Sequence, residues 1–312
     1  MSDVIKRMAH VALQVPDLDA SVAWATKVMG MREVERAAGV SYLTHAACHH
    51  SLQYIAGDRP GLDHIAMEAH DVQALGTLVR RLRDHKIVIV SDQPEELGIG
   101  HAVRFLGPDG HVFEVFSGMA SLGTTHTGAG VQPRKFGHPT LTCPDIGPTR
   151  ELFERVLGFR LSDEIGPGLL GFLRCNVDHH GLGLQKGIAG INHYAWQVQS
   201  LAILGVLGDI LYKNGGRFIW GPGRHGAGEN VFTYHYDPSG CIVEYYADLY
   251  QVWDERTYKA GSWAADDWRA QNLWGPGAPL EMLQAATPLA EQIRGGHGSR
   301  HPGWRLPGGG LP

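Results

Sequence analysis

Apolar and polar positions follow two different periods along most of the chain. Over residues 71–85, Leu75, Leu78 and Leu82 recur at the spacing that places them on one face of a helix. Comparable helices are expected at three other places: residues 17–29, the segment that begins at Gly147, and residues 200–214. Runs such as His111–Phe116 show the alternation that is typical of strands. The pattern predicts a strand, a helix and then further strands, several times over.

The chain contains two copies of one unit. Motifs of the first copy recur in the second at nearly constant offsets of 128, 129 and 130 residues: His10 with His138, His64 with His193, and Glu114 with Glu244. A constant offset over such a distance indicates domain duplication. Each copy divides again into two similar halves. The expected fold class is therefore α+β, with two domains of two βαβββ modules each and a C-terminal tail.

The domain boundaries follow from this repeat. We predict an N-terminal domain over residues 1–119 and a C-terminal domain over residues 134–250, joined by small residues at 120–133. Residues 251–312 lie beyond the repeat and form a C-terminal extension. We expect three features in this extension: a Trp-rich segment packed near the site (253–274), one helix (280–293), and a tail without regular structure (295–312).

Composition and charge narrow the function classes. The chain of 312 residues carries a net charge of −5 and no block of Lys or Arg, so nucleic acid and an anionic membrane surface are poor candidates as partners. No run of about 18 apolar residues is present, and a transmembrane helix is therefore not expected. The four cysteines are isolated, which indicates buried thiols in a reducing compartment. We expect a cytoplasmic protein.

Candidate chemistry is concentrated in the stretch Gly221–Glu244. It contains a Gly/Pro loop with His225, a strand-like run with Tyr234, a turn at Asp237–Gly240 and a second run that carries Glu244. Pro at the second turn position and Gly at the fourth favour a type I turn, which folds the two runs into a hairpin. His225, Tyr234 and Glu244 can then face one small volume. Imidazole, phenol and carboxylate groups together are typical of a metal site with acid–base assistance.

The order Gly-x-His, then Tyr, then Asp-Pro-x-Gly-x-x-x-Glu resembles the signature of type I extradiol ring-cleavage dioxygenases, members of the vicinal oxygen chelate superfamily. The resemblance covers roughly residues 8–248, and Thr233 stands where the family usually has an apolar residue. It implies that His138, His193 and Glu244 bind Fe(II), with Mn(II) as an alternative. It further implies a catechol and O2 as substrates, and a homo-oligomer that is a tetramer or larger.

The resemblance also implies acid–base roles for His180, His225 and Tyr234. His180 is chosen over His179 because His180-Gly-Leu-Gly-Leu matches the family pattern of a His followed by alternate apolar residues. His179 is expected to face solvent, since adjacent strand residues face opposite sides.

The first copy keeps the residue types of the metal-binding set in His10, His64 and Glu114. Its surroundings differ, because Arg104 falls where Tyr234 stands in the second copy. The first copy also has no counterpart of the His in the Gly/Pro loop. Since such partners tune bound ligands, we predict that the first copy is inactive and is filled by packing and hydrogen bonds rather than by a second metal ion.

Trp220 indicates the polarity of the substrate. In branches of the family that take catechols with a carboxylate side chain, an Arg typically precedes the Gly-Pro-Gly-Arg-His segment, where this chain has Trp220. An indole cannot pair with a carboxylate, but it can stack on a neutral ring. We therefore expect a neutral substituted catechol or a trihydroxybenzene, contacted by Trp220, Phe172 and Trp196.

Two other interpretations fit a chain of this superfamily. A glyoxalase-like isomerase would use a comparable metal-binding set, but it leaves His180, His225 and Tyr234 without a role. A non-enzymatic ligand-binding member would need no metal, so the retained metal-binding set argues against it.

Overall fold

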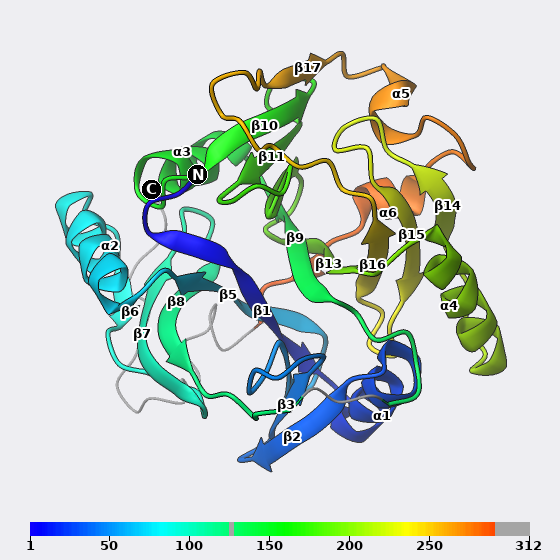
Figure 1. Cartoon of the computed structure of the whole chain (residues 1–312), viewed down its shortest axis with the longest axis horizontal. Helices are drawn as coiled ribbons and strands as arrows, with labels where there is room; N and C mark the ends of the chain where they lie inside the picture. The colour runs from blue at the N-terminus through cyan, green and yellow to red at the C-terminus, as the bar shows by residue number, and fades with distance from the viewer. Residues whose placement is uncertain (125–127, 291–312) are drawn as a thin grey trace.

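The computed structural model describes residues 1–124 and 128–290, and Figure 1 shows its course. The first copy of the repeat forms two modules. The first module consists of β1 (Ile5–Val15), α1 (Leu18–Trp24), the π-helical turn η1 (Ala25–Met29), β2 (Arg32–Ala37), β3 (Val40–Thr44) and β4 (Leu52–Ala56). The second consists of β5 (Gly61–Ala69), α2 (Val72–Asp84), β6 (Ile89–Ser91), β7 (Ile99–Leu106) and β8 (Val112–Met119).

The second copy repeats this order. The third module consists of β9 (Lys135–Cys143), α3 (Ile146–Arg155), β10 (Arg160–Ile165), β11 (Leu170–Arg174) and β12 (Leu182–Lys186). The fourth consists of β13 (Gly190–Gln197), α4 (Leu201–Lys213), β14 (Trp220–Arg224), β15 (Val231–Tyr236) and β16 (Ile242–Ala247). Each module has one strand, a helical segment and three further strands, which confirms the predicted α+β fold of βαβββ modules.

Each copy forms one sheet with the same internal plan. The first sheet runs β2-β3-β4-β1-β5-β8-β7-β6, and the second runs β14-β15-β16-β13-β9-β12-β11-β10 before the C-terminal extension adds to it. The first strands of paired modules, β1 with β5 and β9 with β13, are antiparallel neighbours at the centre. Each of them pairs in parallel with the last strand of its own module. The centre of each sheet therefore collects residues from distant parts of the chain.

Aspartates mark the starts of three repeat helices. Asp17, Asp71 and Asp145 have extended backbone, and their carboxylates accept hydrogen bonds from N–H groups of the first turn. Such a cap stabilises a helix by about 1 kcal/mol, which explains why the predicted starts agree with the structure. The helices α2 and α4 have 13 residues each. Among the described residues, none of the helices is long and apolar enough to span a membrane.

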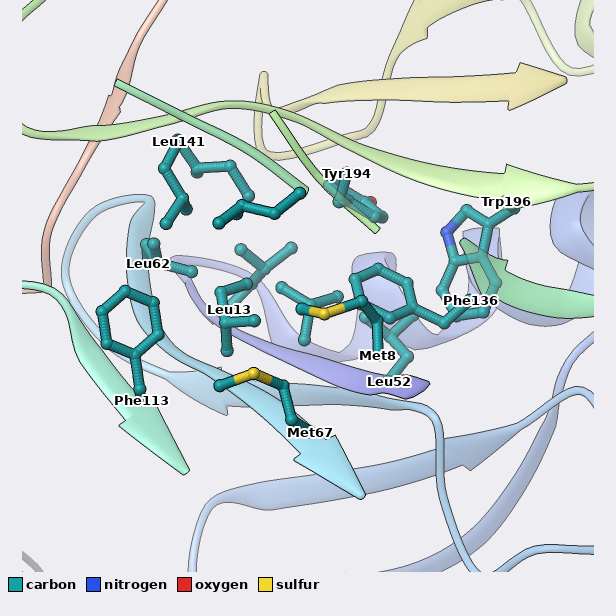
Figure 2. Close-up of a cluster of buried hydrophobic side chains, with 14 of the residues drawn as sticks. Met8, Leu13, Leu52, Leu62, Met67, Phe113, Phe136, Leu141, Tyr194 and Trp196 are labelled. Carbon is teal, nitrogen blue, oxygen red and sulfur yellow. The ribbon is translucent and has the colours of Figure 1, made fainter. Parts of the chain in front are cut away.

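The main apolar core lies between the two sheets and their helices. Figure 2 shows Leu13, Leu62 and Phe113 of the first sheet facing Leu141 and Tyr194 of the second. All five side chains are buried. Because successive strand residues face opposite sides, a strand that gives one set of side chains to this core gives the other set to the opposite face of its sheet. That opposite face carries the polar residues that were predicted to bind a metal ion.

The C-terminal extension packs back onto the second sheet. Its strand β17 (Gly261–Trp263) pairs with β10, and β18 (Thr287–Pro288) pairs with β13. Two short helices, α5 (Trp268–Gln271) and α6 (Leu280–Gln284), lie between these strands in sequence. The Trp-rich segment lies near the candidate functional site, as predicted, because Ala265 and Ala270 of this segment line the cavity at that site.

The expectation of one helix over residues 280–293 is wrong. α6 ends at Gln284, and Thr287 and Pro288 form the short strand β18 instead. Thr287 precedes a proline, a position that disfavours the helical backbone and favours an extended one. Residues 291–293 lie outside the described residues, as does the tail 295–312 for which no regular structure was expected.

Candidate functional site

Three side chains of the second sheet meet at one cavity. His138 on β9, His193 on β13 and Glu244 on β16 are buried, and one possible ligand atom from each lies within 4.8 Å of the others. Nε2 of His138 is 3.0 Å from Oε2 of Glu244, and Nε2 of His193 is 3.2 Å from the same oxygen. Two imidazoles and one carboxylate around a common point form a donor set that could hold a divalent metal ion.

The strand register brings these residues together. Ala195 of β13 is paired with His138 on one side and with Glu244 on the other. His193 is two residues from Ala195 and therefore faces the same side of the sheet. On the next strand, Tyr234 of β15 is paired with Glu244 and continues the row. Residues more than a hundred positions apart in the sequence thus share one face and one level of the sheet.

Two asparagines orient the donor set. Nδ2 of Asn192 donates to two backbone carbonyls of the C-terminal extension at 2.9 Å each, and its Oδ1 lies 2.7 Å from Nδ1 of His193. Nδ1 of His193 therefore carries the proton and leaves Nε2 bare on the side of Glu244. Nδ2 of Asn230 donates to Oε1 of Glu244 at 3.1 Å. Both contacts hold the donor atoms in place before any ligand binds.

The buried carboxylate of Glu244 requires a compensating positive charge. Burial by itself raises the pKa of Glu244, but His138 and His193 outweigh that effect and hold the pKa well below its usual value. Burial lowers the pKa of His193, which favours the neutral imidazole that binds metals. Among the described residues, no Lys or Arg forms an ion pair with Glu244, and Nε2 of His193 has no hydrogen-bond partner. These features fit a divalent cation.

Tyr234 and His225 form a hydrogen-bonded pair beside the donor set. Nε2 of His225 lies 3.1 Å from Oη of Tyr234, and Nδ1 of His225 bonds to the backbone carbonyl of Gln271. A carbonyl only accepts, so Nδ1 carries the proton and Nε2 accepts the Tyr234 hydroxyl. Burial lowers the pKa of His225 to about 4, while burial and the Glu244 carboxylate raise the pKa of Tyr234 well above its usual value. The pair is therefore neutral.

His180 approaches the donor set from a different side. Its ring packs against His138 and Phe172, with centroid distances of 4.3 and 4.8 Å. It lines the same cavity, and burial together with His138 and His179 holds its pKa well below the usual value. The expectation that His179 faces solvent is wrong, because its side chain is only 2% exposed. Both histidines precede β12 in a bend where strand alternation does not apply, and Tyr250 pairs with the His179 backbone.

The cavity at the donor set has a volume of about 260 Å³. Much of its wall is apolar, with contributions from Ile165, Leu169, Leu170, Phe172, Trp220 and Met282. Trp220 stacks on Tyr234 at a centroid distance of 5.1 Å, and its indole N–H donates to the carbonyl of Pro276. Lys186 is the one Lys or Arg among the described lining residues, and it is exposed. The cavity suits a flat, mainly apolar molecule whose polar groups face the donor set.

The expected substrate contacts divide into two groups. Phe172 and Trp220 belong to the cavity wall, whereas Trp196 lies in the main apolar core. Trp196 follows Ala195 on β13 and therefore faces the side opposite to the donor set. Its indole packs against Phe136 (Figure 2), and the two ring centroids are 5.3 Å apart. The expectation that Trp196 contacts the substrate is wrong.

The equivalent place in the first sheet contains an internal cation. Arg104 on β7 occupies the position of the β15 tyrosine, with its Nε 2.7 Å from Oε2 of Glu114. The same guanidinium bonds to Glu96, which enters from the loop between β6 and β7. Oxygens of Glu96 lie 3.1 Å from His10 and 2.8 Å from His64. In the first sheet, the guanidinium of Arg104 thus supplies the positive charge that the donor set of the second sheet lacks.

Sequence reasoning misses several residues that support the site. Asn192 has a detectable signal, since Asp63 precedes His64 in the first copy as Asn192 precedes His193. Asn230 belongs to no repeated motif, and its contact with the donor set appears only when the hairpin folds.

Comparisons with known proteins agree with this geometry. The chain matches the model of the Glyoxalase/Bleomycin resistance protein/Dioxygenase superfamily twice, over residues 7–115 and 135–245. It is 25% identical to a manganese-dependent 2,3-dihydroxybiphenyl 1,2-dioxygenase of Geobacillus genomosp. 3, over 90% of this chain and 98% of that protein. It is 27% identical to metapyrocatechase 2 of Cupriavidus necator, over 86% and 89% of the two chains. A solved Mn(II)-bound glyoxalase from Novosphingobium aromaticivorans is 28% identical and superposes with a TM-score of 0.82, over 93% and 99%.

The two matched segments correspond to the two sheets and together make up more than half of the chain. Similar proteins bear the names of extradiol ring-cleavage dioxygenases, which confirms the resemblance drawn from the Gly221–Glu244 motif. The chain belongs to the Glyoxalase/Bleomycin resistance protein/Dioxygenase superfamily, also called the vicinal oxygen chelate superfamily.

Proposed function

We propose that the protein catalyses extradiol cleavage of a catechol ring by O2, with Fe(II) or Mn(II) held by three side chains: His138, His193 and Glu244. The observation that carries the proposal is the convergence of this donor set with the neutral Tyr234–His225 pair and with His180 around one cavity. A donor set alone would suit many metal enzymes. The additional acid–base groups suit a substrate that must lose hydroxyl protons, as a catechol does.

The donor chemistry supports a metal ion of this kind. Two imidazoles and one carboxylate leave coordination positions open for substrates. When bound, such an ion would lower the pKa of a coordinating hydroxyl and orient the catechol and O2 next to each other. One relative is named as manganese-dependent, so Mn(II) is a candidate beside Fe(II).

The protein's own groups handle protons on two sides of the donor set. Tyr234 packs on His193 at a centroid distance of 5.2 Å, and a proton that reaches Oη of Tyr234 can pass to Nε2 of His225. His180 packs on His138 instead, so it can take up or return a proton from another direction. Tyr234 and His180 are buried and His225 is partly buried, which limits the access of bulk water to these groups.

The cavity wall supports a neutral substituted catechol or a trihydroxybenzene as the substrate. Trp220 presents an apolar ring beside Tyr234 and no charge for a carboxylate. The exposed position of Lys186 puts its charge at the rim rather than deep in the cavity. Alkyl or aryl substituents would gain about 25 cal/mol per Å² of apolar surface buried against this wall.

Oxygen uptake tests the proposed activity. Anaerobically purified protein is loaded with Fe(II) or Mn(II) and mixed with a panel of neutral and carboxylated catechols. We expect O2 consumption and a yellow ring-fission product with at least one neutral catechol. The proposal is wrong if protein with a full metal content consumes no O2 with any catechol.

A glyoxalase-like isomerase is the second candidate, because a similar solved structure is named a Mn(II)-bound glyoxalase. Isomerisation moves protons within one substrate and consumes no O2, so it leaves the Tyr234–His225 pair and His180 without separate roles. The metal-loaded protein can be assayed with the hemithioacetal of methylglyoxal and a thiol. Turnover of this compound without O2 uptake on catechols would favour the isomerase.

A further inference from the structure

A second buried histidine lies directly behind His180. Nδ1 of His180 is 3.0 Å from Nδ1 of His179, and Nε2 of His179 is 3.4 Å from Oδ2 of Asp163 on β10. All three side chains are buried. Asp163 and His179 also line a second, more open hollow of about 550 Å³. The three side chains therefore form a continuous polar line that leads from the hollow to the cavity.

The outer end of this line is held by the C-terminal extension. Oδ1 of Asp163 accepts the backbone N–H of Gly261 at 2.8 Å, and Oδ2 accepts Nε1–H of Trp263 at 3.2 Å. Burial raises the pKa of Asp163, but hydrogen bonds from His179, Trp263 and Gly261 outweigh burial and lower it. The carboxylate is therefore ionised at neutral pH and can only accept hydrogen bonds.

An ionised carboxylate decides which nitrogen of His179 carries the proton. Nε2 of His179 bears its N–H on the side of Asp163, so Nδ1 of His179 has a free lone pair. Two nitrogens 3.0 Å apart need one donor and one acceptor, and His180 must therefore donate from its Nδ1. A neutral His180 then has a bare Nε2. This is the ring nitrogen that remains for a molecule in the cavity.

We propose that Asp163 and His179 are positioning residues that fix His180 as the Nδ1–H tautomer, so that its Nε2 can accept a proton from the substrate. The inference rests on the proposed function, in which His180 is an acid–base group. When Nε2 takes up a proton, the Nδ1–H of His180 remains bonded to His179, and no hydrogen bond behind it has to change. The same Nε2 can then return the proton to the product.

The loop between β14 and β15 closes over the two histidine rings. Gly228 in this loop has a φ of +84°, and a Cβ there would lie 3.1 Å from Nδ1 of His179 and 3.3 Å from Cε1 of His180. Its carbonyl accepts the N–H of Tyr250, whose own carbonyl accepts the N–H of His179. Glycine thus allows the backbone to cover the contact between the rings, which keeps water from offering them alternative partners.

The first sheet contains the same line of side chains. Nδ1 of His49 is 2.9 Å from Nδ1 of His50, and Nε2 of His49 is 3.3 Å from Oε2 of Glu35. A β-bulge precedes Glu35 on β2 and Asp163 on β10, which identifies them as equivalents. In the first sheet, however, Nε2 of His50 lies 3.0 Å from the buried carboxylate of Glu96 and is occupied. The first-sheet pair is therefore a matched control.

Neutron diffraction of the metal-loaded protein in D2O locates the proton between the two histidines. We expect deuterium on Nδ1 of His180 and on Nε2 of His179, and none on Nδ1 of His179. Deuterium on Nδ1 of His179 would overturn the proposal, whatever the activity. A wild-type protein with the expected deuterium positions that cleaves no catechol would instead refute the proposed function and confirm the tautomer.

Steady-state kinetics tests the role in turnover. His179→Leu removes the acceptor, and we expect kcat to fall by about tenfold or more, with a smaller change in KM and an unchanged metal content. His179→Gln offers an acceptor oxygen and should recover part of the loss. His49→Leu makes the same change in the first sheet and should leave kcat unaltered. An unchanged kcat in His179→Leu, or an equal loss in His49→Leu, would overturn the positioning role.

Discussion

Arg104 stands opposite Glu114 between β7 and β8, as Tyr234 stands opposite Glu244 between β15 and β16. The two pairs are equivalents in the duplicated sheets, yet they differ in charge. Arg104 places a guanidinium nitrogen 2.7 Å from Glu114, whereas Tyr234 offers a neutral hydroxyl beside Glu244. The residue paired with the glutamate therefore makes the difference. With Arg104 the carboxylate of Glu114 already has a cation beside it, and with Tyr234 the carboxylate of Glu244 still requires one.

We expect the wild-type protein to bind one metal ion per chain. In the first sheet, Arg104 forms ion pairs with both Glu114 and Glu96, so a divalent ion there would lie beside a buried guanidinium. Elemental analysis by plasma mass spectrometry, with the protein concentration from amino-acid analysis, measures the ratio. Two metal ions per chain, both needed for activity, would contradict the expectation.

Removal of a donor in the second sheet should abolish metal binding. Glu244→Ala or His193→Ala takes away one of three ligands, and we expect no bound Fe(II) or Mn(II) after gel filtration and no turnover. Circular dichroism should show that the fold remains. Glu114→Gln changes the equivalent residue of the first sheet and should keep the metal content of the wild type. Full metal content in Glu244→Ala would disprove the assignment of the donor set.

The acid–base groups should separate from the metal ligands in their effect. His180→Asn and Tyr234→Phe are expected to keep the metal but to lower kcat by about 10²–10⁴, the range for loss of a general acid–base group. Tyr245→Phe is a suitable control, since Tyr245 is a buried residue of the apolar core on β16. Metal analysis and kcat are measured on the same preparations. Wild-type kcat in both His180→Asn and Tyr234→Phe would remove the proposed roles.

Trp220 should set the preference for neutral substrates. We expect the wild type to have a higher kcat/KM for 4-methylcatechol than for 3,4-dihydroxyphenylacetate, and Trp220→Arg to narrow or reverse that ratio by offering a partner for the carboxylate. Trp220→Phe keeps an aromatic wall and should keep the preference. If the wild type favours the carboxylated compound, the cavity argument fails, and Lys186→Met would then show whether Lys186 is responsible.

His235 should make the folded state sensitive to acid. Its ring lies 5.5 Å from Trp24 of the first copy and 5.7 Å from Tyr245, and neither ring nitrogen has a hydrogen-bond partner among the described residues. Burial lowers the pKa of His235 from 6.5 to about 3. A depressed pKa means that this contribution to stability is complete above pH 6.5 and is lost progressively as the pH falls toward 3.

Replacing this histidine should therefore reduce the acid sensitivity. The free energy of unfolding in urea should decrease for both proteins when the pH is lowered from roughly 7 to 5.5. The decrease should be about 1 kcal/mol smaller for His235→Phe than for the wild type. Other titrating groups are shared by both proteins and cancel in the comparison. Parallel pH profiles for the two proteins would show that His235 does not titrate in the proposed way.

The sequence by itself determined the modules and the set of candidate donors. Apolar periodicity and the aspartate caps are local signals, so the repeat helices begin where they were expected. The constant offset between the copies relates His138, His193 and Glu244 to His10, His64 and Glu114, so each copy carries the same set of candidate donors. Strand alternation counted from His193 also predicts that Trp196 faces the opposite side of the sheet.

Tertiary structure alone decided what surrounds those donors. His179 is buried because the loop with Gly228 and the Tyr258 ring of the extension pack against it, and Asn192 is oriented by backbone carbonyls nearly a hundred residues away. Glu96 reaches the first-sheet cluster from a loop that no repeated motif marks. Burial and hydrogen-bond partners depend on which segments pack against a strand after folding. Local sequence patterns predict which side of a strand a residue faces, but they do not predict which distant segment packs against that side.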